Sequence, residues 1–291
     1  MNGIETIRAR LAARYALDLY LPASRAARRL RETSRALRGK RSVATRLEQA
    51  EWRGLLPRRS IRLADTGKRS GNVNVAELAI LAQAAAATEP GRTIVEIGTF
   101  DGRTTLNLAI NAPADCPILT LDLPDEHETA FPLEDSERPL VQKLASGERF
   151  RACASAWRSF AARITQAFGD SATYDWTPCY GRAGLVFVDG SHAYDYVRKD
   201  SETAFDLVAS GGVVLWHDYG VWPGVTRALE EFEAVRRLGL RHIRGTSLVL
   251  WRAPARVTPH TVAGQDGAEP LHVAAPAATA VDGTPPFLPR E

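Results

Sequence analysis

Four polar residues follow two apolar runs late in the chain and could together carry out metal or proton-transfer chemistry. Asp189 ends a run of four apolar residues, and His192 follows three positions later. The adjacent pair His217 and Asp218 ends the next apolar run. The two carboxylates could hold a divalent cation through oxygen ligands, with His217 as a nitrogen ligand or as a neighbour of the ligands. Such a cation would lower the pKa of a bound hydroxyl, whose proton His192 could accept.

The elements around these residues must bring them together. The two apolar runs, 184–188 and 211–216, read as strands, and the segment between them has helical spacing. Strands joined by a helix of this length form a right-handed unit of adjacent parallel strands. The polar residues then meet at the carboxyl edge of the sheet, where ligands bind in open α/β folds. The alternative interpretation is structural: a strand end, a helix cap, a packing residue and a turn residue.

A glycine turn earlier in the chain is a second candidate site. Residues 93–97 read as a buried strand that contains Glu96, the turn holds Gly98 and Gly102, and a helix begins at Thr104. A strand, a glycine turn and a helix N-terminus are typical of a site for a nucleotide-like ligand. The glycine spacing fits neither the dinucleotide fingerprint nor the P-loop. The alternative is that the glycines only permit a strand-to-helix turn.

Two further strands end in acids that could contact the same ligand. The strand 117–122 ends in Asp122, about 25 residues after the glycine turn, where an acid can accept hydrogen bonds from ribose hydroxyls. A surface loop acid is the alternative. The strand 163–168 is followed by Gly169, Asp170 and Ser171.

These motifs together resemble a known enzyme family. Glu-x-Gly-x-x-x-Gly-x-Thr at 96–104 resembles motif I of the class I S-adenosylmethionine-dependent methyltransferases. Phe-Val-Asp-Gly-Ser-His-x-Tyr-x-x-Val at 187–197 and Gly-Gly-x-x-x-x-His-Asp at 211–218 resemble one bacterial group of that family. The group includes macrolide sugar O-methyltransferases and cephalosporin-hydroxylase-like proteins, and more distantly the catechol type. The resemblance covers about residues 73–252.

The resemblance implies roles for particular residues. S-adenosyl-L-methionine would be bound at its amino-acid end near Glu96 and Gly98, at its ribose by Asp122, and at its adenine by Asp170. The full set of implied cofactor-binding residues is Glu96, Gly98, Thr99, Asp101, Gly102, Thr104, Asp122, Asp170 and Ser171. The catalytic pair would be His192 as base and Asp189. A divalent cation, Mg²⁺ in the relatives, would be held by Asp189, Asp218 and His217; His217 stands where the relatives carry an acid.

The expected fold is α/β. The resemblance implies a Rossmann-like, seven-stranded, mostly parallel sheet with helices on both faces and a C-terminal antiparallel strand, preceded by a helical N-terminal extension. A hairpin at 240–252 would supply the antiparallel strand. The predicted organisation is a basic helical extension (1–56), a linker (57–72), the methyltransferase domain (73–252) and a disordered tail (253–291). Residues 124–160 are expected to form a charged insertion with one or two helices.

The charge of the chain is strongly asymmetric. The net charge is +3, but residues 1–62 hold 16 Lys/Arg and 5 Asp/Glu, so this segment carries +11 and the remainder −8. Helical spacing runs from residue 4 to residue 50, and Pro22 predicts a break into at least two helices. The arginines could face an anionic membrane surface, nucleic acid or an anionic carrier. We favour a solvated face packed on the main domain or on a second subunit, because no nucleic-acid motif accompanies the charge.

The remaining features favour a cytoplasmic enzyme. Three cysteines without a Cys-x-x-Cys pair indicate neither a disulfide framework nor a zinc cluster. No run of about 18 apolar residues predicts a transmembrane helix, and no secretory signal is recognised. The predicted function is a metal-assisted O-methyltransferase acting on a hydroxyl of a small molecule or sugar, with homo-oligomerisation left open. The alternatives are a non-catalytic cofactor-binding or scaffolding protein that docks through its basic helices, and a hydroxylase-like relative.

Overall fold

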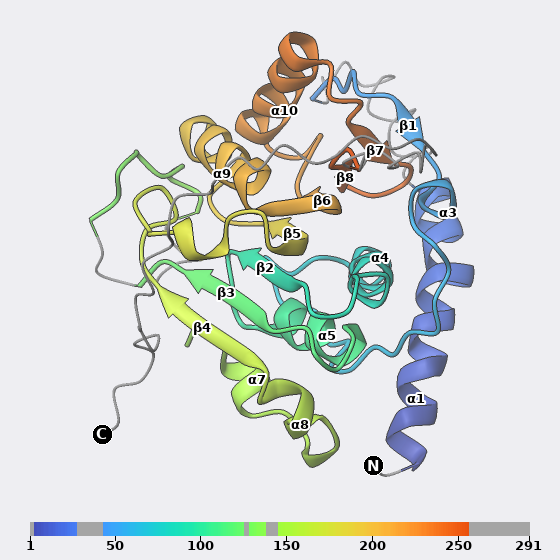
Figure 1. Cartoon of the computed structure of the whole chain (residues 1–291). Coiled ribbons are helices and arrows are strands. Elements are labelled where there is room, and N and C mark those ends of the chain that lie inside the picture. Colours follow the sequence, from blue (N-terminus) through green and yellow to red (C-terminus); the bar gives the residue numbers. More distant parts are fainter. Residues whose placement is uncertain (1–2, 28–42, 125–127, 138–144, 256–291) are drawn as a thin grey trace, which may run out of the picture. The chain divides into compact units, whose positions relative to one another are not determined.

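The computed structural model describes residues 3–27, 43–124, 128–137 and 145–255. In these residues a single eight-stranded sheet has the order β1-β7-β8-β6-β5-β2-β3-β4 (Figure 1). The strands are β1 (Gln49–Ala50), β2 (Thr93–Ile97), β3 (Ile118–Asp122), β4 (Ile164–Phe168), β5 (Ala183–Val188), β6 (Val208–Trp216), β7 (Arg241–Ile243) and β8 (Val249–Arg252).

Strand direction confirms the predicted fold class. β8 lies between β6 and β7 and is antiparallel to both, while all other neighbours in the sheet are parallel. The seven predicted strands correspond to β2 through β8. β1 is an addition at the edge, where Gln49 and Ala50 pair with His242 and Ile243 of β7. A strand of two residues has no periodicity from which it could be predicted.

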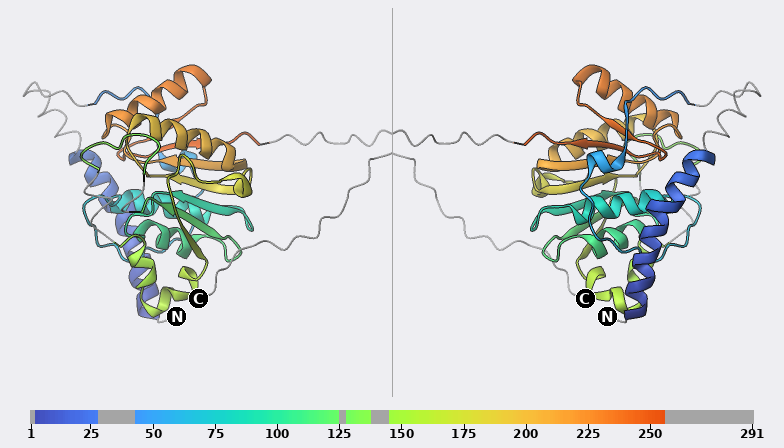
Figure 2. Two further views of the ribbon diagram at one scale, coloured as in Figure 1. Left: turned by 90° about the vertical axis from the view of Figure 1, so that its left-hand side faces the viewer. Right: turned by 90° about the vertical axis from the view of Figure 1, so that its right-hand side faces the viewer.

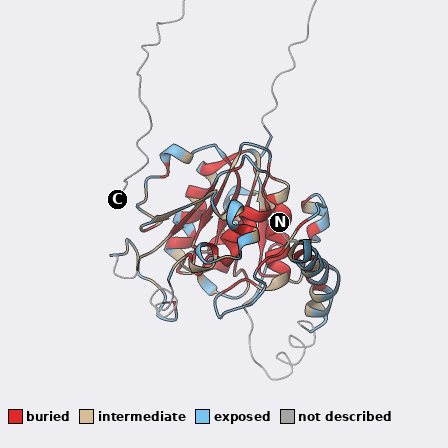
Figure 3. Cartoon of the chain, turned by 90° about the horizontal axis from the view of Figure 1, so that it is seen from below, coloured by how far each residue is buried: buried red, intermediate tan, exposed pale blue. Residues whose placement is uncertain are grey.

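Helices cover both faces of the sheet (Figures 1 and 3). Neighbouring strand residues point to opposite faces, so Ile94 packs with the helices α4 and α5 while Val95 packs with α9 and α10. Both faces are therefore buried, which is typical of a parallel sheet. The helices are α1 (Gly3–Arg14), α3 (Trp52–Leu55), α4 (Val75–Ala86), α5 (Arg103–Asn111), α7 (Glu148–Arg151), α8 (Arg158–Ala161), α9 (Tyr194–Leu207) and α10 (Pro223–Arg236).

The start of α4 is fixed by a capping box. The Asn74 side chain accepts hydrogen bonds from the backbone N–H groups of Ala76 and Glu77, and the Glu77 carboxylate accepts from the Asn74 N–H. One oxygen of Glu77 thus accepts a hydrogen bond from the backbone N–H at the start of the helix. The same carboxylate lies at the carboxyl edge of the sheet. The intrinsic helix propensity of α4 is high, because six of its twelve residues are alanine.

The predicted break at Pro22 is wrong for the described part of the extension. Residues 3–27 are helical throughout: α1 is followed by a π-helical segment, η1 (Tyr15–Tyr20), and residues 21–27 remain helical. The wider turn, in which the Leu21 N–H donates to the Ala16 carbonyl, lies directly before the proline. Residues 43–48, also predicted as helix, are extended or irregular. Residues 28–42 lie outside the described residues.

The segment predicted as a linker carries apolar residues into the core. Within 57–72, Ile61 and Leu63 are buried among residues of α4 and the sheet. The Leu63 N–H donates to the Ala9 carbonyl of α1 at 3.0 Å. The insertion 124–160 contains α7, a 3₁₀ turn, η2 (Ser155–Trp157), and α8 where it is described. The predicted tail lies outside the described residues from 256 on. Among the described helices, none has the length and apolarity needed to span a membrane.

Candidate active site

A cavity of about 2010 Å³ opens at the carboxyl ends of β2 to β6. The chain leaves β2 toward β3 on one side and returns as β5 on the other, so this edge contains the topological switch point of the sheet. Seven of the predicted site residues line the cavity: Gly98, Asp122, Ser171, Asp189, His192, His217 and Asp218. The structure therefore brings the two predicted halves of the site into one space.

Gly98 is the residue that allows the loop after β2 to approach β5. Its φ is +97°, a region that favours glycine. A Cβ atom at this position would lie 2.1 Å from the carbonyl oxygen of Asp189 and 2.8 Å from the Gly190 nitrogen. A side chain cannot be accommodated there, so the two loops touch only because residue 98 is glycine.

The other predicted residues of the glycine turn lie behind the cavity wall rather than on it. Glu96 is fully buried, and its Oε2 accepts hydrogen bonds from the Thr105 and Thr120 hydroxyls at 2.5 and 2.7 Å. Burial raises the pKa of Glu96 to about 8 against the effect of these hydrogen bonds. Thr99 shares a 2.6 Å hydrogen bond with Thr120. Glu96 thus connects β2 to β3 and to α5, the helix that follows the glycine turn.

Asp101 and Asp170 hold neighbouring segments in place. Asp101 accepts hydrogen bonds from the Asn72 side chain and the Arg103 N–H, and forms an ion pair with Arg149 at 2.9 Å. Gly102, with φ +81°, and Thr104 begin α5. Asp170 is buried and accepts from the Ala130 N–H at 2.6 Å and the Tyr196 hydroxyl at 2.8 Å.

Asp122 lies on the cavity wall at the end of β3, as expected for a contact with a polar ligand. Burial raises the pKa of its carboxyl to about 6, although the Ser146 hydroxyl and neighbouring backbone N–H groups donate to it. Ser171, after β4, lies on the same wall. The order β2-β3-β4 places both residues on one side of Gly98, away from β5 and β6.

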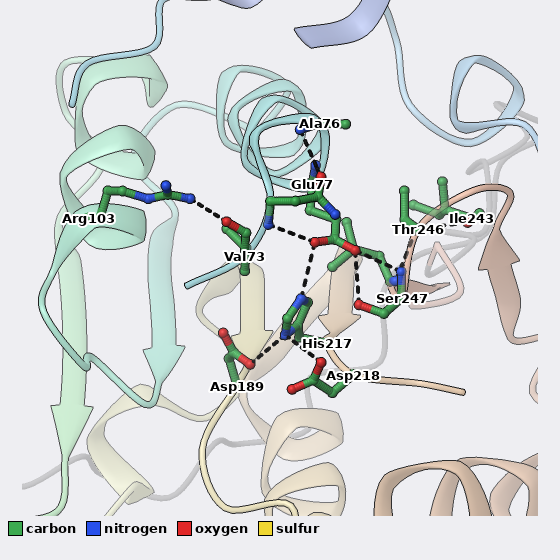
Figure 4. A network of polar contacts seen from close by, with 12 residues as sticks. Val73, Ala76, Glu77, Arg103, Asp189, His217, Asp218, Ile243, Thr246 and Ser247 are labelled. Atoms are coloured by element: carbon green, nitrogen blue, oxygen red, sulfur yellow. Dashed lines mark hydrogen bonds and ion pairs between the residues drawn. The ribbon is translucent and has the colours of Figure 1, made fainter. Parts of the chain in front are cut away.

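His217 lies at the centre of a cluster of three carboxylates (Figure 4). Its Nδ1 is 3.0 Å from Asp189 Oδ1 and 3.3 Å from Asp218 Oδ1. Its Nε2 is 3.3 Å from Glu77 Oε2. Burial by itself would lower the pKa of His217, but the three carboxylates outweigh burial and raise that pKa well above its usual value. Both ring nitrogens face carboxylates, so this environment favours an imidazolium ion over the predicted metal ligand.

Glu77 is a member of the cluster that the sequence did not reveal as such. Besides capping α4, it accepts hydrogen bonds from the Ser247 N–H and hydroxyl at 2.8 and 2.9 Å. Burial opposes ionisation of Glu77, yet the positive charge of His217 lowers its pKa to about 2. Nothing local in the sequence indicated a contact with His217, 140 residues away.

His192 faces the cavity between two carboxylates. Its Nε2 is 2.7 Å from Asp218 Oδ2, and its Nδ1 and backbone N–H both contact the Glu137 carboxylate. The ring stacks on Trp222, with ring centroids 4.4 Å apart and planes 14° apart. Burial would lower the pKa of His192, but the hydrogen bonds to Asp218 and Glu137 raise it to about 9. The ring is therefore held in one orientation by contacts on three sides.

Glu137 was predicted only as one of many charges in the insertion. Its side chain is 4% exposed and also accepts from the Ser191 hydroxyl at 2.9 Å. The insertion thus reaches across to the loop that follows β5 and supplies a site residue. No spacing rule links position 137 to position 192, so only the folded chain shows the pair.

Asp218 contacts two histidines from a left-handed backbone conformation. Its φ is +62°, a left-handed conformation that costs aspartate about 1 kcal/mol. This turn lets the carboxylate contact His192 with one oxygen and lie near His217 with the other. Asp189, His192 and Asp218 each offer one ligand atom, all within 4.8 Å of one another. Two oxygens and one imidazole nitrogen are a donor set that fits a divalent cation.

Comparison with known families supports the resemblance found in the sequence. Residues 95–219, from β2 to the turn after β6, match the family model described as a methyltransferase domain. This part of the chain contains Gly98, Asp122, Asp189 and His192. Residues 95–219 are therefore similar to a methyltransferase domain, and they include the strands β2 to β6 of the Rossmann-like sheet.

Solved structures give weaker likenesses. The O-methyltransferase TomG from Streptomyces achromogenes, in complex with SAM, is 19% identical over 62% of this chain and 82% of its own, with a TM-score of 0.43. The O-methyltransferase NovP is 16% identical over 62% and 81%, with a TM-score of 0.47. An O-methyltransferase from Bacillus cereus, in complex with SAH, is 15% identical over 64% and 84%, with a TM-score of 0.41. At these scores the three likenesses assign no function to this chain. No curated protein matches it.

Proposed function

We propose that this protein transfers the methyl group of S-adenosylmethionine to a hydroxyl of a small molecule or sugar. The observation that carries the proposal is the single cavity at the carboxyl edge of the sheet, which joins a glycine turn of methyltransferase type to a histidine held between carboxylates. A cavity of about 2010 Å³ is larger than the 300–1,000 Å³ of most small-molecule sites. It has room for a cofactor and an acceptor together.

The cofactor is assigned to the side of the cavity formed by β2, β3 and β4. The turn at Gly98 leads into the N-terminus of α5, and Asp122 offers a carboxylate at the distance along the chain typical of a ribose contact. The sulfonium methyl would then point toward the ends of β5 and β6, the neighbours of β2 on its other side.

The acceptor is assigned to the side where His192 and Asp218 lie. As the acceptor oxygen forms its bond to the methyl carbon, the carbon–sulfur bond of the sulfonium breaks and the hydroxyl proton moves to His192 Nε2. Glu137 and Trp222 hold the imidazole with Nε2 toward Asp218 on the cavity wall, and Nε2 would exchange its contact with Asp218 for the acceptor hydroxyl. Positioning of the two reactants supplies much of the rate in such a displacement.

Asp189, Asp218 and His192 could hold a divalent cation in place of the predicted set with His217. Bound there, the cation would lower the pKa of the acceptor hydroxyl. The imidazolium form of His217 would remain beside the carboxylates and limit the negative charge that a cation has to neutralise. If His192 is a ligand, it cannot also accept the proton, so the metal and the histidine base are alternatives to be separated by experiment.

Calorimetric titration of the protein with S-adenosylmethionine and with S-adenosylhomocysteine is the decisive first test. We expect binding of both ligands, weakened when Asp122 is replaced by Asn. An exposed acid outside the cavity, Glu128, gives the matched Glu128→Gln control. The absence of heat with either ligand would overturn the proposal.

Catalysis is tested separately by methyl transfer to a panel of hydroxylated acceptors. Tight cofactor binding without turnover on any acceptor would favour the scaffolding alternative. Iron found in the purified protein by metal analysis would favour the hydroxylase-like alternative. For the cation, we expect EDTA and Asp189→Asn to lower activity, and added Mg²⁺ to restore it only in the EDTA-treated wild type. Full activity in EDTA would remove the cation from the proposal and leave His192 as the base.

A further inference from the structure

The outer face of the helical segment 3–27 carries a row of exposed apolar side chains. We call this row the apolar stripe; its members are Ile4, Ile7, Leu11, Tyr15 and Leu19, which are 52–64% exposed. Their spacing of three or four residues places them on one side of a helix. Among the described residues nine large apolar side chains are exposed, and five of them belong to this one stripe. Scattered exposed residues need no explanation, but a continuous stripe does.

The fold does not require the stripe, because the opposite side of the same helix attaches it to the domain. Ala9, Ala13, Ala16 and Leu21 are buried. The last three pack in the cluster that contains α4, and the Ala9 carbonyl accepts from the Leu63 N–H. The helix runs along the outside of the domain beside α4 and α5 (Figures 1 and 2). Its outer face is therefore fixed in position but uncovered in the described chain.

Arginines accompany the stripe. Arg8, Arg10 and Arg14 are exposed and form no ion pair with any described residue. Arg8 follows Ile4 by four residues and precedes Leu11 by three, so it lies within the stripe itself. The segment has two acids: Asp18 is paired with Arg53 at 3.1 Å, and Glu5 is outnumbered by the three arginines. The segment thus combines apolar side chains with an excess of positive charge.

We propose that this face docks on an anionic lipid surface, with the helix lying in the plane of the membrane interface. Apolar side chains on one side and arginines beside them are typical of interfacial helices, whose arginines extend toward lipid phosphates. A second copy of the chain is a poorer occupant, since pairing two stripes would bring the Arg8 side chains of both copies into an apolar contact. The proposal is independent of the methyl-transfer proposal and needs no catalytic activity for its test.

Cosedimentation of the full chain with large unilamellar vesicles tests the proposal. Each arginine near an anionic surface contributes about a fivefold gain in binding. We therefore expect tight binding to phosphatidylglycerol-containing vesicles, weak binding to pure phosphatidylcholine, and a loss of affinity as NaCl is raised. Arg8→Gln/Arg10→Gln/Arg14→Gln should lower the affinity about a hundredfold, and Ile7→Ser/Leu11→Ser about tenfold or more.

The matched control is Val235→Ser with Arg58→Gln, which removes an exposed apolar residue and an exposed arginine elsewhere on the surface. It should bind like the wild type, and thermal unfolding should show that all variants are folded. Equal binding to both vesicle types, or none to either, would overturn the proposal. So would a dimer in light scattering that the Ile7→Ser/Leu11→Ser change converts to monomer without any vesicle binding, because the stripe would then be an interface between copies.

Discussion

At the scale of single residues, the site is a balance of charge between carboxylates and histidines. Glu77, Glu137, Asp189 and Asp218 supply four negative charges when ionised, and two imidazole rings lie among them. Removing one partner of a buried pair costs more than the pair contributes, because the other charge is left uncompensated. Single substitutions here are therefore expected to change pKa values and stability as well as turnover.

The pH dependence of methyl transfer reports on Glu137. In metal-free buffer, a rate that needs neutral His192 should rise with pH toward about 9, where that histidine loses its proton. Glu137→Gln removes one of the two carboxylates that raise the pKa, so the rise should move to lower pH by about one unit. The measurement is kcat/KM against pH on the first acceptor identified.

The control for this profile is Glu134→Gln, a change of an exposed acid three residues earlier in the same insertion. This change should leave the midpoint of the rise in kcat/KM with pH unchanged. A midpoint that stays near 9 in Glu137→Gln would show that the contact with Glu137 does not set the protonation of His192.

For Glu96 the prediction concerns the stability of the fold rather than the activity. Its pKa rises from 4.5 to about 8 on folding, so its contribution is fully present below about pH 4.5 and is lost as pH rises through 8. Glu96→Gln keeps an acceptor for Thr105 and Thr120 but never ionises. We expect it to be more stable than the wild type by about 4 kcal/mol at pH 8, and nearly equal to it near pH 4.5. Urea unfolding at the two pH values is the measurement, with Glu128→Gln as the neutral control.

At the scale of elements, one side chain of α4 adds polar contacts to the apolar packing of that helix on the sheet. Glu77 contacts His217 after β6 and Ser247 before β8 while it caps its own helix. The carboxyl edge of the sheet is therefore connected to the helix that precedes β2, as well as to the loops that follow the strands.

Glu77→Gln should destabilise the fold by about 3–5 kcal/mol, because it leaves the His217 charge without one of its partners. The pKa of Glu77 is lowered to about 2, so its contribution is present above about pH 4.5 and is lost as pH falls toward 2. The deficit of the variant in urea unfolding should accordingly be largest above pH 4.5. Glu89→Gln, an exposed acid shortly after α4, should cost less than about 1 kcal/mol. Equal losses in the two variants would contradict this account.

The start of α10 is packed directly on the loop that carries His192. A Cβ atom on Gly224 would lie 2.3 Å from the His192 carbonyl oxygen and 2.8 Å from the Tyr194 nitrogen. Gly224→Ala must therefore displace the helix or the loop, and a shift of about 1 Å at a reacting group lowers kcat about a hundredfold. Cofactor affinity should change little, since Gly224 lies on the β5 and β6 side of the site. Gly54→Ala, where nothing lies within 4 Å of the added Cβ, is the control.

At the scale of the whole molecule, the strands and helices that the sequence predicted are those whose patterns lie within one short segment of the chain. β2 to β8, α9 and α10 follow from apolar runs, turns and helix starts, and each acid at a strand end is visible as a neighbour of its strand. The residues that were missed depend on contacts between distant segments. Glu137 and Glu77 reach the site from other elements, and the interior position of Glu96 is a property of the packed sheet.

The edge strand β1 also has a consequence for the order in which the chain can fold. Its residues Gln49 and Ala50 pair with His242 and Ile243, about 190 residues later in the sequence. A ribosome adds roughly 5–20 residues per second, so this pairing must wait roughly 10–40 s after β1 has been made. During that interval the basic N-terminal helix has left the ribosome, but β7, the strand with which β1 pairs, has not yet been synthesised. The apolar surfaces of that helix are then open to chaperones, to lipid or to other nascent chains before the sheet is complete.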